Sequence, residues 1–294
     1  MTGVIMRSLS GFYDVDCQGL RLRCRGRGRL RYQKTKPLVG DRVAVTQVNE
    51  TEGTLDEVLP RLNAFHRPAV ANVQQMVIVA SGAVPVTDPF LIDRLTALAV
   101  SRSCTPVVVW NKWDLAPVTE LCQIYEQAGF PVIRCSAVNG EGIEALRRQI
   151  TGKVSVFTGN TGVGKSSILN ALAPGIQLPT GEVSAKLGRG RHTTRHVEIY
   201  RLPSDILVAD TPGFASFEEE RDPCEDPAEL AACFPDFRPY LEECAFVDCA
   251  HVKEKGCRLL RAVADGAVHE SRHRSYVRLY QQVKEHYRPW QKRD

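Results

Sequence analysis

A glycine-rich segment at residues 159–166 reads Gly-Asn-Thr-Gly-Val-Gly-Lys-Ser, the spacing of a phosphate-binding Walker A loop. Its three glycines allow successive backbone N–H groups to point at phosphate oxygens. Lys165 would reach the β- and γ-phosphates and serve both binding and catalysis, and the Ser166 hydroxyl would bind Mg²⁺. The segment predicts a nucleoside triphosphate site, whose expected contacts are Thr158, Gly159, Asn160, Thr161, Gly162, Val163, Gly164, Lys165, Ser166 and Ser167.

A second motif, Asn111-Lys112-Trp113-Asp114, has the pattern of a guanine reader. The Asp114 carboxylate can accept both the ring N–H and the amino group of guanine, while Asn111 addresses the other edge. Adenine offers neither donor in that geometry, so such a site can discriminate by about 10⁴ or more. Asp114 therefore favours GTP over the alternative of a P-loop ATPase. The dipeptide Ser136-Ala137 matches the loop that closes over guanine in such sites.

The order of these motifs is unusual. A GTPase core normally runs from phosphate loop through the switches to the base reader, but here the base reader precedes the phosphate loop. The chain is therefore interpreted as a circularly permuted GTPase.

Residues for the metal and for the attacking water are expected after the phosphate loop. Asp210-Thr-Pro-Gly213 follows an apolar strand, so that Asp210 can hold Mg²⁺ through water and Gly213 can present its N–H to the γ-phosphate. The segment 188–194 lies where a first switch belongs, and either Thr193 or Thr194 is expected to bind Mg²⁺.

Phe214 stands where small GTPases carry a water-orienting glutamine, and a phenyl ring cannot orient water. Hydrolysis is then either slow or assisted by another group, for which His192 is the candidate. The alternative is that His192 only contacts RNA or solvent.

Four residues near the C-terminus have metal-ligand spacing. Cys244, Cys249, His251 and Cys257 supply three thiolates and one imidazole, a complete tetrahedral set for one structural Zn²⁺. The remaining cysteines show no such grouping and are interpreted as buried or incidental thiols.

Arginine recurs at every second position between residues 21 and 31. On an extended strand this period places the side chains on one face. Phosphate backbone would neutralise such a row, so an RNA contact is predicted; the alternative is a charged barrel edge that resists aggregation. The row consists of Arg21, Arg23, Arg25, Arg27, Arg29 and Arg31. A second basic group at 271–290 includes Arg272, His273, Arg274 and Arg278. Its tyrosines fall on one helical face and are interpreted as core residues, with a base-stacking platform as the alternative, which leaves the basic residues of the remaining face free to touch RNA.

Three domains are expected to position these residues. Residues 1–66 show short β-like pieces typical of a five-stranded barrel, with an OB-fold as the obvious candidate. Residues 67–217 alternate apolar strands with helical stretches, which indicates a doubly wound, mostly parallel α/β sheet. Residues 218–294 form a zinc-binding helical module. With no signal-peptide pattern and no apolar stretch long enough to span a bilayer, we expect a cytoplasmic protein that does not engage membranes, and a monomer by default.

The motif order together with the Cys-x4-Cys-x-His-x5-Cys spacing resembles the bacterial ribosome small-subunit-dependent GTPase A family. The resemblance also includes Val39-Gly-Asp-Arg-Val43 and Arg191-His-Thr-Thr194 and covers essentially the whole chain. It implies an N-terminal OB-fold, binding to the small ribosomal subunit and its rRNA late in maturation, and GTP hydrolysis stimulated by that subunit. The competing hypothesis is a regulatory RNA-binding module that keeps GTP as a structural ligand.

Overall fold

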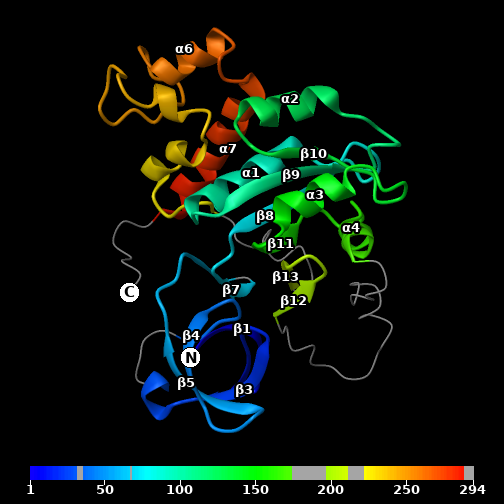
Figure 1. The fold of residues 1–294 in the computed structure, drawn as a ribbon. Helices are drawn as coiled ribbons and strands as arrows, with labels where there is room; N and C mark the ends of the chain where they lie inside the picture. The colour runs from blue at the N-terminus through cyan, green and yellow to red at the C-terminus, as the bar shows by residue number, and fades with distance from the viewer. Residues whose placement is uncertain (32–35, 67, 174–196, 211–221, 288–294) are drawn as a thin grey trace.

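The computed structural model describes residues 1–31, 36–66, 68–173, 197–210 and 222–287. Within these ranges the chain forms an N-terminal barrel, a central sheet covered by helices on both faces, and a C-terminal helical module (Figure 1).

The barrel has five strands, β1 (Thr2–Leu9), β2 (Phe12–Cys17), β3 (Leu20–Gly26), β4 (Arg42–Gln47) and β5 (Glu52–Val58). Their order is β1-β2-β3-β5-β4, and β1 also pairs with β4, which closes the barrel. The β3–β5 pair is parallel and the others are antiparallel. The predicted OB-type barrel is therefore confirmed. Its interior is apolar because alternate residues point inward, among them Ile5, Val15, Leu22, Val43 and Leu55.

The central sheet contains β8 (Gln75–Ser81), β9 (Thr105–Asn111), β10 (Val132–Arg134), β11 (Val154–Thr158), β12 (Glu198–Leu202) and β13 (Ile206–Asp210). Their order is β10-β9-β8-β11-β13-β12, and every pair is parallel except β12–β13. The doubly wound sheet was predicted, but the antiparallel strand β12 was not. This strand also pairs with β1 at Arg7↔Glu198, so the barrel and the sheet are continuous.

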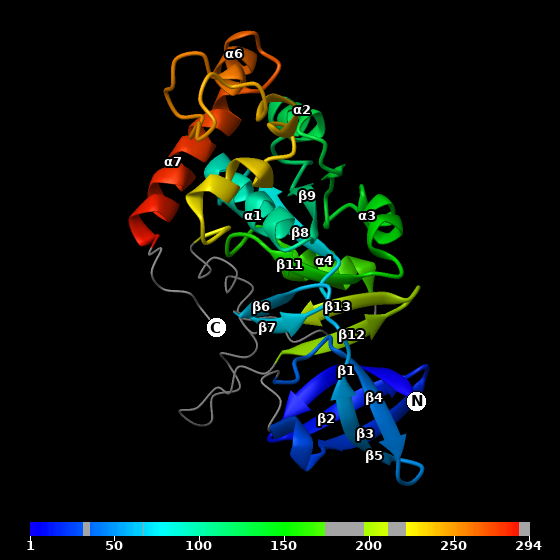
Figure 2. The ribbon, with the colours of Figure 1, turned by 90° about the vertical axis from the view of Figure 1, so that its left-hand side faces the viewer.

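Helices cover both faces of this sheet, as Figure 2 shows. On one face lie α1 (Pro89–Ser101) and α2 (Thr119–Gln127), and on the other lie α3 (Ile143–Ile150) and α4 (Lys165–Leu172). Strand β8 explains the two layers, because Met76 and Ile78 join the first core while Val77 and Val79 join the second. Both faces of the strand are buried, which accounts for its continuous apolar sequence.

A hairpin, a tight turn and a pair of hydrogen bonds fix the strands of the central sheet at the end nearest the barrel. The hairpin β6 (Ala64–His66) and β7 (Ala69–Ala71) lies between barrel and sheet. The three-residue turn 151–153 joins α3 to β11, and in it the Gly152 N–H donates to the Asp205 carbonyl at 3.0 Å. Gln74, one residue before β8, exchanges two 2.9 Å hydrogen bonds with Val154 at the start of β11.

The C-terminal module contains the single-turn segments η3 (Pro227–Glu229), η4 (Ala231–Cys233) and η5 (Arg238–Tyr240), followed by α6 (Arg258–Ala264) and α7 (Glu270–His286). The aromatic core of this module stacks Phe234 on Phe237, with Tyr276 of α7 set edge-on to both. The expected core role of the α7 tyrosines is confirmed for Tyr276, which is 1% exposed.

The basic face expected on α7 is wrong at Arg272, which is buried, whereas Arg274 and Arg278 are exposed. Arg272 is 1% exposed and binds Asp93 of α1 at 2.6 Å and Asp236 at 2.8 Å. Burial acts to lower the pKa of this guanidinium, but the two carboxylates raise it above its ordinary value. Two further basic side chains of α7 are also engaged, since His273 contacts the His251 carbonyl and Arg278 stacks over the Phe90 ring at 3.7 Å. Arg272 and Arg278 both connect α7 to α1, and Arg272 needs its two carboxylates because a charge buried this deeply requires partners.

Among the helices that the structure describes, none is both long and apolar enough to cross a membrane.

Candidate nucleotide site and metal cluster

The predicted nucleotide motifs meet at one edge of the central sheet. The phosphate loop follows β11, the Asn-Lys-Trp-Asp motif follows β9, and Ser136 follows β10. These three strands are parallel, so their carboxyl ends lie at the same edge, where open α/β sheets bind ligands.

Two glycines of the phosphate loop are required by close packing as well as by backbone conformation. Gly159 has a φ of +128°, and a Cβ there would lie 2.1 Å from the Val79 carbonyl oxygen. Gly164 has a φ of +97°, and a Cβ there would lie 2.2 Å from Asn111 Nδ2. Any side chain at either position would displace the loop from the neighbouring strands.

Lys165 begins α4, and its side chain folds back over the loop. Its ammonium group donates to the carbonyl oxygens of Gly159 and Asn160, the latter at 2.7 Å, and the residue is 8% exposed. The cation is therefore held against the backbone of the phosphate loop.

Asn111 connects the three loops. Its Nδ2 donates to the Val163 carbonyl of the phosphate loop at 2.8 Å, and its Oδ1 accepts from the Ala137 N–H at 3.1 Å. The residue is 3% exposed. The sequence assigned Asn111 to an edge of the base, and the structure adds this positioning role. In the sequence, the Asn-Lys-x-Asp pattern is the one feature from which this positioning role of Asn111 could have been predicted.

The rest of the motif is arranged around a left-handed residue. Lys112 has a φ of +58°, and its Nζ donates to the Val84 carbonyl at 2.7 Å. The Trp113 N–H donates to the Cys135 carbonyl at 3.0 Å, and the Arg134 guanidinium lies 5.6 Å from the Trp113 ring centre. Asp114 is exposed to solvent. A carboxylate at this edge is therefore open to a ligand.

The Ser136–Gly142 loop is fixed by its own hydrogen bonds. The buried Ser136 donates its N–H to the Glu141 carbonyl at 3.0 Å, and Gly142 has a φ of +72°, where a Cβ would meet the Arg134 carbonyl oxygen. Ala137 is half-buried beside Asn111. The expected closing loop is thus held against the base-reading motif.

The predicted metal-binding and catalytic residues are described only in part. Thr158 is buried at the end of β11, Ser166 is half-buried in the first turn of α4, and Ser167 is exposed. Asp210 ends β13, where its backbone is in register with Glu198 of β12. The remaining expected residues lie outside the described ranges; they are His192, Thr193, Thr194 and Gly213.

Sequence reasoning missed the loop 82–88 after β8. Pro85 of this loop lies against Gly162, since a Cβ on that glycine would be 3.4 Å from the proline ring. The Val84 carbonyl accepts from Lys112, while the Val84 and Val86 side chains are exposed. The loop thus lines the site through a backbone oxygen and a ring, neither of which leaves a recognisable motif.

The second predicted site lies in the C-terminal module. The ligand atoms of Cys244, Cys249, His251 and Cys257 all lie within 4.8 Å of one another. His251 Nδ1 is 3.7 Å from Cys244 Sγ and 3.4 Å from Cys257 Sγ, and those two sulfurs are 4.0 Å apart. Such separations suit the edges of a tetrahedron around one ion, so this group can hold a metal.

Surrounding groups hold these ligands in place. His251 is left-handed, with a φ of +57°, and its carbonyl contacts the His273 ring at 2.8 Å. The Tyr276 hydroxyl donates to the Ala250 carbonyl at 2.6 Å. Glu254 accepts from two successive backbone N–H groups, which closes the turn before Cys257. The fixed backbone orients the ligands before any ion arrives.

Burial shifts the pKa of three of the four ligands. Burial raises the pKa of the Cys249 thiol to about 12 and also raises that of Cys257, whereas burial lowers the pKa of His251. A buried neutral imidazole is a ready ligand, and the thiols release protons to a bound cation.

Three residues of the arginine row share the outer face of β3, as predicted. Arg21, Arg23 and Arg25 are exposed, and Leu22 and Cys24 between them are buried. Two of these guanidinium groups stack on the Phe12 ring, with centroid distances of 4.6 Å for Arg23 and 4.4 Å for Arg25.

The end of the row departs from the predicted single face. Arg27 lies beyond the strand and binds Asp56 at 2.9 Å, so the protein's own carboxylate neutralises part of the row. Arg29 and Arg31 belong to η1 (Gly28–Arg31), of which only the backbone is described at these two positions.

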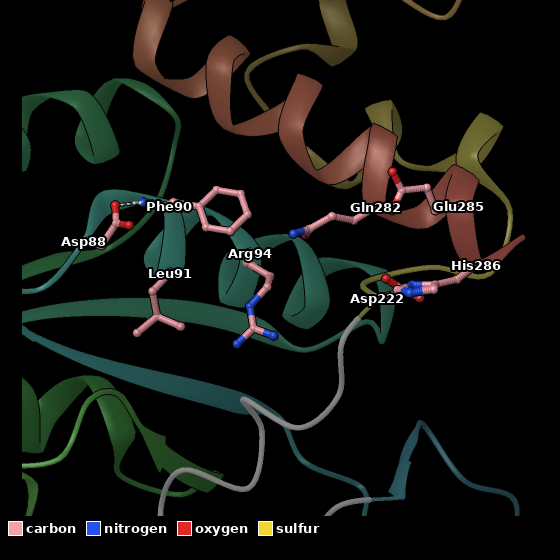
Figure 3. A pocket seen from close by; sticks show the side chains of 8 residues that line it. All are labelled: Asp88, Phe90, Leu91, Arg94, Asp222, Gln282, Glu285 and His286. Atoms are coloured by element: carbon pink, nitrogen blue, oxygen red, sulfur yellow. Dashed lines mark hydrogen bonds and ion pairs between the residues drawn. The ribbon is translucent and has the colours of Figure 1, made fainter.

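A separate hollow of about 500 Å³ lies between the start of α1 and the end of α7 (Figure 3). It is lined by residues of both helices, and at one end His286 Nδ1 lies 2.9 Å from Asp222. None of the residues that line this hollow belongs to a nucleotide-binding motif, so the hollow is separate from the nucleotide site.

Two family models match the chain. The RsgA GTPase model matches residues 58–220, and the RsgA N-terminal domain model matches residues 2–55. Curated relatives named "Small ribosomal subunit biogenesis GTPase RsgA" include those of Moorella thermoacetica, 42% identical, and Geobacillus thermodenitrificans, 43% identical. Each alignment covers 96% of this chain and 97% of the relative.

Solved structures agree with the fold. YjeQ from Thermotoga maritima has a TM-score of 0.83 at 34% identity, over 96% of this chain and 98% of its own. YloQ, described as a circularly permuted GTPase, has a TM-score of 0.81 at 32% identity, over 98% of this chain and 96% of its own. The predicted circular permutation is thereby confirmed. Because a GTPase family model matches more than half of the chain and relatives above 40% identity span nearly all of it, the chain belongs to the RsgA GTPase family.

Proposed function

We propose that this chain binds GTP with Mg²⁺ at the edge where β9, β10 and β11 end, hydrolyses it, and acts in the biogenesis of the small ribosomal subunit. The family match and the names of the curated relatives support this function. We further propose that the subunit stimulates turnover and that the protein acts in the cytoplasm as a monomer.

The observation that carries the proposal is the position of Asn111. One side chain joins the base-reading motif to the phosphate loop through Val163 and to the closing loop through Ala137. Three loops from distant parts of the chain are therefore held in one arrangement, with an exposed carboxylate at Asp114 and a buried cation at Lys165. A site with a fixed acceptor at one end and N–H groups at the other suits a guanine nucleotide.

In this proposal Asp114 accepts from guanine, Lys112 and Trp113 flank the base, and Ser136 and Ala137 close over it. Lys165 leaves the carbonyls of Gly159 and Asn160 and binds phosphate oxygens instead, because a charged acceptor makes the stronger hydrogen bond.

Ser166 and Asp210, with Thr193 or Thr194, would hold Mg²⁺, and Gly213 would donate to the γ-phosphate. When bound, this ion neutralises charge that develops on the transferred phosphoryl group. His192 is proposed to orient the attacking water, since Phe214 cannot.

We propose that the cluster of Cys244, Cys249, His251 and Cys257 holds one structural Zn²⁺. Three thiolates and one imidazole fill its coordination and leave no position for water, so the ion would stabilise the module and take no part in hydrolysis. The proposed domains are residues 1–66, 67–217 and 218–294, each with the role expected from the sequence.

The exposed faces of Arg21, Arg23 and Arg25 are proposed to contact rRNA phosphates. Two of them are held in place by Phe12, which leaves less side-chain freedom to lose when a phosphate binds.

The deciding experiment compares GTP turnover with and without purified small subunits, for the natural chain and for His192→Ala, Lys165→Ala and the exposed control Asn170→Ala. We expect low intrinsic turnover and a gain of about 10²-fold on the subunit, equivalent to about 2.7 kcal/mol. His192→Ala should lose the gain while keeping GTP affinity, and Lys165→Ala should lose both binding and turnover.

Two outcomes would change this assignment. If GTP binds tightly but turnover stays at the background rate with subunits present, the chain uses GTP as a structural ligand, as the absent glutamine would allow. If His192→Ala retains the full gain, another group positions the water.

A further inference from the structure

The barrel meets the GTPase domain along strand β12, which lies between β1 and β13 (Figure 2). Arg7 of β1 is in register with Glu198 of β12, and Glu198 is in register with Asp210, the last residue of β13. Neighbouring strands lie about 4.8 Å apart, so the barrel backbone at Arg7 is two strand spacings from the backbone of the residue proposed to hold Mg²⁺. A contact between the barrel and β12 therefore acts on the immediate neighbour of the strand that carries Asp210.

Two ion pairs, which we call the seam pairs, join the barrel to β12. At the start of β12, Arg7 Nε lies 3.7 Å from Glu198. At its end, the Arg201 guanidinium donates to Asp16 of β2 at 2.9 Å and also binds Asp205, in the turn from β12 to β13. The seam pairs thus hold both ends of β12, and through Asp205 the start of β13, to the barrel.

The seam pairs differ in how firmly they are made. Asp16 is 9% exposed, and its other oxygen accepts from the Gly19 N–H at 2.7 Å, so the carboxylate that Arg201 meets is fixed in place. The Arg7 side chain is 43% exposed, and within the described ranges its Nε makes no hydrogen bond. The pair of Arg201 with Asp16 is therefore the firmer attachment of the β12–β13 hairpin.

Asp16 lies between two arginines. Arg201 approaches it from the GTPase domain, and Arg21 of β3 is directly opposite it within the barrel. Residues directly opposite on neighbouring strands share a face, so both guanidinium groups attract the same carboxylate. All three residues line one hollow of about 380 Å³ between the barrel and β12. Arg21 is exposed and is one of the arginines proposed to contact rRNA phosphates.

A phosphate bound to Arg21 would change this competition. It neutralises Arg21, so that Asp16 loses one of its two attracting cations and holds Arg201 more strongly. The coupling is reciprocal, because whatever holds the hairpin to the barrel also favours phosphate on Arg21.

We propose that Asp16 and Arg201 are positioning residues for GTP hydrolysis. Their ion pair holds the β12–β13 hairpin against the barrel and so sets the position of the strand that ends at Asp210. A phosphate of rRNA on Arg21 strengthens the pair, which passes contact with RNA on the barrel to the metal-binding strand. The inference rests on the proposed GTP and Mg²⁺ site, and its test therefore includes a measurement that needs neither ligand.

That measurement is hydrogen exchange of the full chain without nucleotide. Arg201→Gln should speed exchange across residues 198–210, because the hairpin loses its firmer attachment. Arg201→Lys keeps the charge and should restore most of the protection. Arg21→Gln removes the competing cation and should slow exchange in the same residues. Arg42→Gln is the matched control, because it removes an exposed barrel arginine that forms no ion pair within the described ranges, and it should change nothing.

The Mg²⁺ dependence of GTP turnover separates positioning from a general loss of structure. Arg201→Gln should raise the Mg²⁺ concentration for half-maximal turnover about two- to fivefold, the size expected for the loss of one half-exposed ion pair. Its GTP affinity measured in EDTA should stay unchanged, and Arg201→Lys should return the Mg²⁺ midpoint toward that of the natural chain. Arg21→Gln should shift the midpoint in the opposite direction. Small subunits added to the natural chain should slow exchange at 198–210, and they should do so less in Arg21→Gln.

The inference is overturned if Arg201→Gln leaves both the exchange and the Mg²⁺ midpoint unchanged, or if Arg42→Gln acts as Arg21→Gln does. An equal loss of GTP affinity in EDTA would also overturn it, because the pair would then support the whole nucleotide site and not the strand of Asp210. A natural chain that does not turn over GTP would instead refute the proposed function, and the exchange measurement would still decide whether the pair holds the hairpin.

Discussion

Asn111 and Val163 lie 52 positions apart in the chain, and the Asn111 amide donates a 2.8 Å hydrogen bond to the Val163 carbonyl. This bond links the motif that would read the base to the loop that would hold the phosphates. The permuted chain order places the base-reading motif before the phosphate loop, and this contact joins the two in the folded protein.

Asn111→Ala should therefore damage more than base recognition. Removing the side chain leaves the buried Val163 carbonyl and the Ala137 N–H without this partner, and lets both loops shift. We expect GTP affinity to fall at least about tenfold, equivalent to about 1.4 kcal/mol. Titration with a fluorescent GTP analogue checks this, and Asn170→Ala on the exposed face of α4 should bind as the natural chain does.

Asp114→Asn should change which base is bound. The amide loses one acceptor for guanine and gains a donor that suits xanthine, so GTP affinity should fall at least about tenfold while xanthosine triphosphate binds in its place. Competition between the two nucleotides measures the switch. Unchanged GTP binding in this variant would remove the motif from the base site.

Arg272→Ala should destabilise the protein strongly, because it leaves Asp93 buried without its guanidinium partner. Breaking a buried pair in this way costs about 3–5 kcal/mol. The matched control is Arg274→Ala, two residues away on α7, which breaks only an exposed pair with Glu270 and should cost at most about 0.5 kcal/mol. Urea unfolding of both variants checks the difference, and equal midpoints would contradict the role given to Arg272.

The strands and site motifs were predictable because their signals are local. An apolar strand such as 154–158, followed by a glycine-rich turn and a helix, shows its structure within about fifteen residues. The Cys-His cluster was predictable for the same reason, since its ligands lie within fourteen residues of sequence.

The burial of Arg272 could not be predicted from local sequence patterns. Its neighbours in sequence are basic and polar, so the pattern favoured an exposed face. Its partner Asp93 is 179 positions away, and no local pattern announces a pair that only the docking of α7 on α1 creates. The loop containing Pro85 was missed for a related reason, because it contributes a backbone carbonyl and a ring edge, which many residue types could supply.

Removing the metal should loosen the C-terminal module and spare the nucleotide site. The ligands converge within one module, and the metal contributes directly to its folding. Elemental analysis should find about one zinc per chain, and Cys249→Ser should lower that content. Hydrogen exchange should then rise around residues 240–260 while GTP affinity stays unchanged. Because the thiols must release protons to bind the ion, zinc should also dissociate as the pH falls. Carefully purified protein without metal would contradict the assignment.

The exposed arginines of β3 should contribute to subunit binding through charge. Replacing Arg21, Arg23 and Arg25 together with Gln should weaken binding and reduce the slope of log affinity against log salt by about two to three, close to one per lost phosphate contact. Arg148→Gln, an exposed substitution on α3, controls for the loss of a surface charge. An unaltered slope would return these residues to the alternative of a charged barrel edge.

The short turn 151–153 between α3 and β11 determines what the last strand of the GTPase domain is joined to. In a GTPase of the usual motif order, the domain would begin at the strand equivalent to β11 and end at the helix equivalent to α3, so no turn would join them. The chain would instead run directly from the equivalent of β13 into the equivalent of β8. Here β8 is entered from the barrel, and the chain after β13 leads to the C-terminal module. In the permuted chain, the segment that follows Asp210 therefore no longer leads to β8. In the usual order both ends of this segment are joined to strands of the sheet, whereas here its far end is joined to the C-terminal module, so the strand that carries Asp210 is connected along the chain to that module and not back to the sheet.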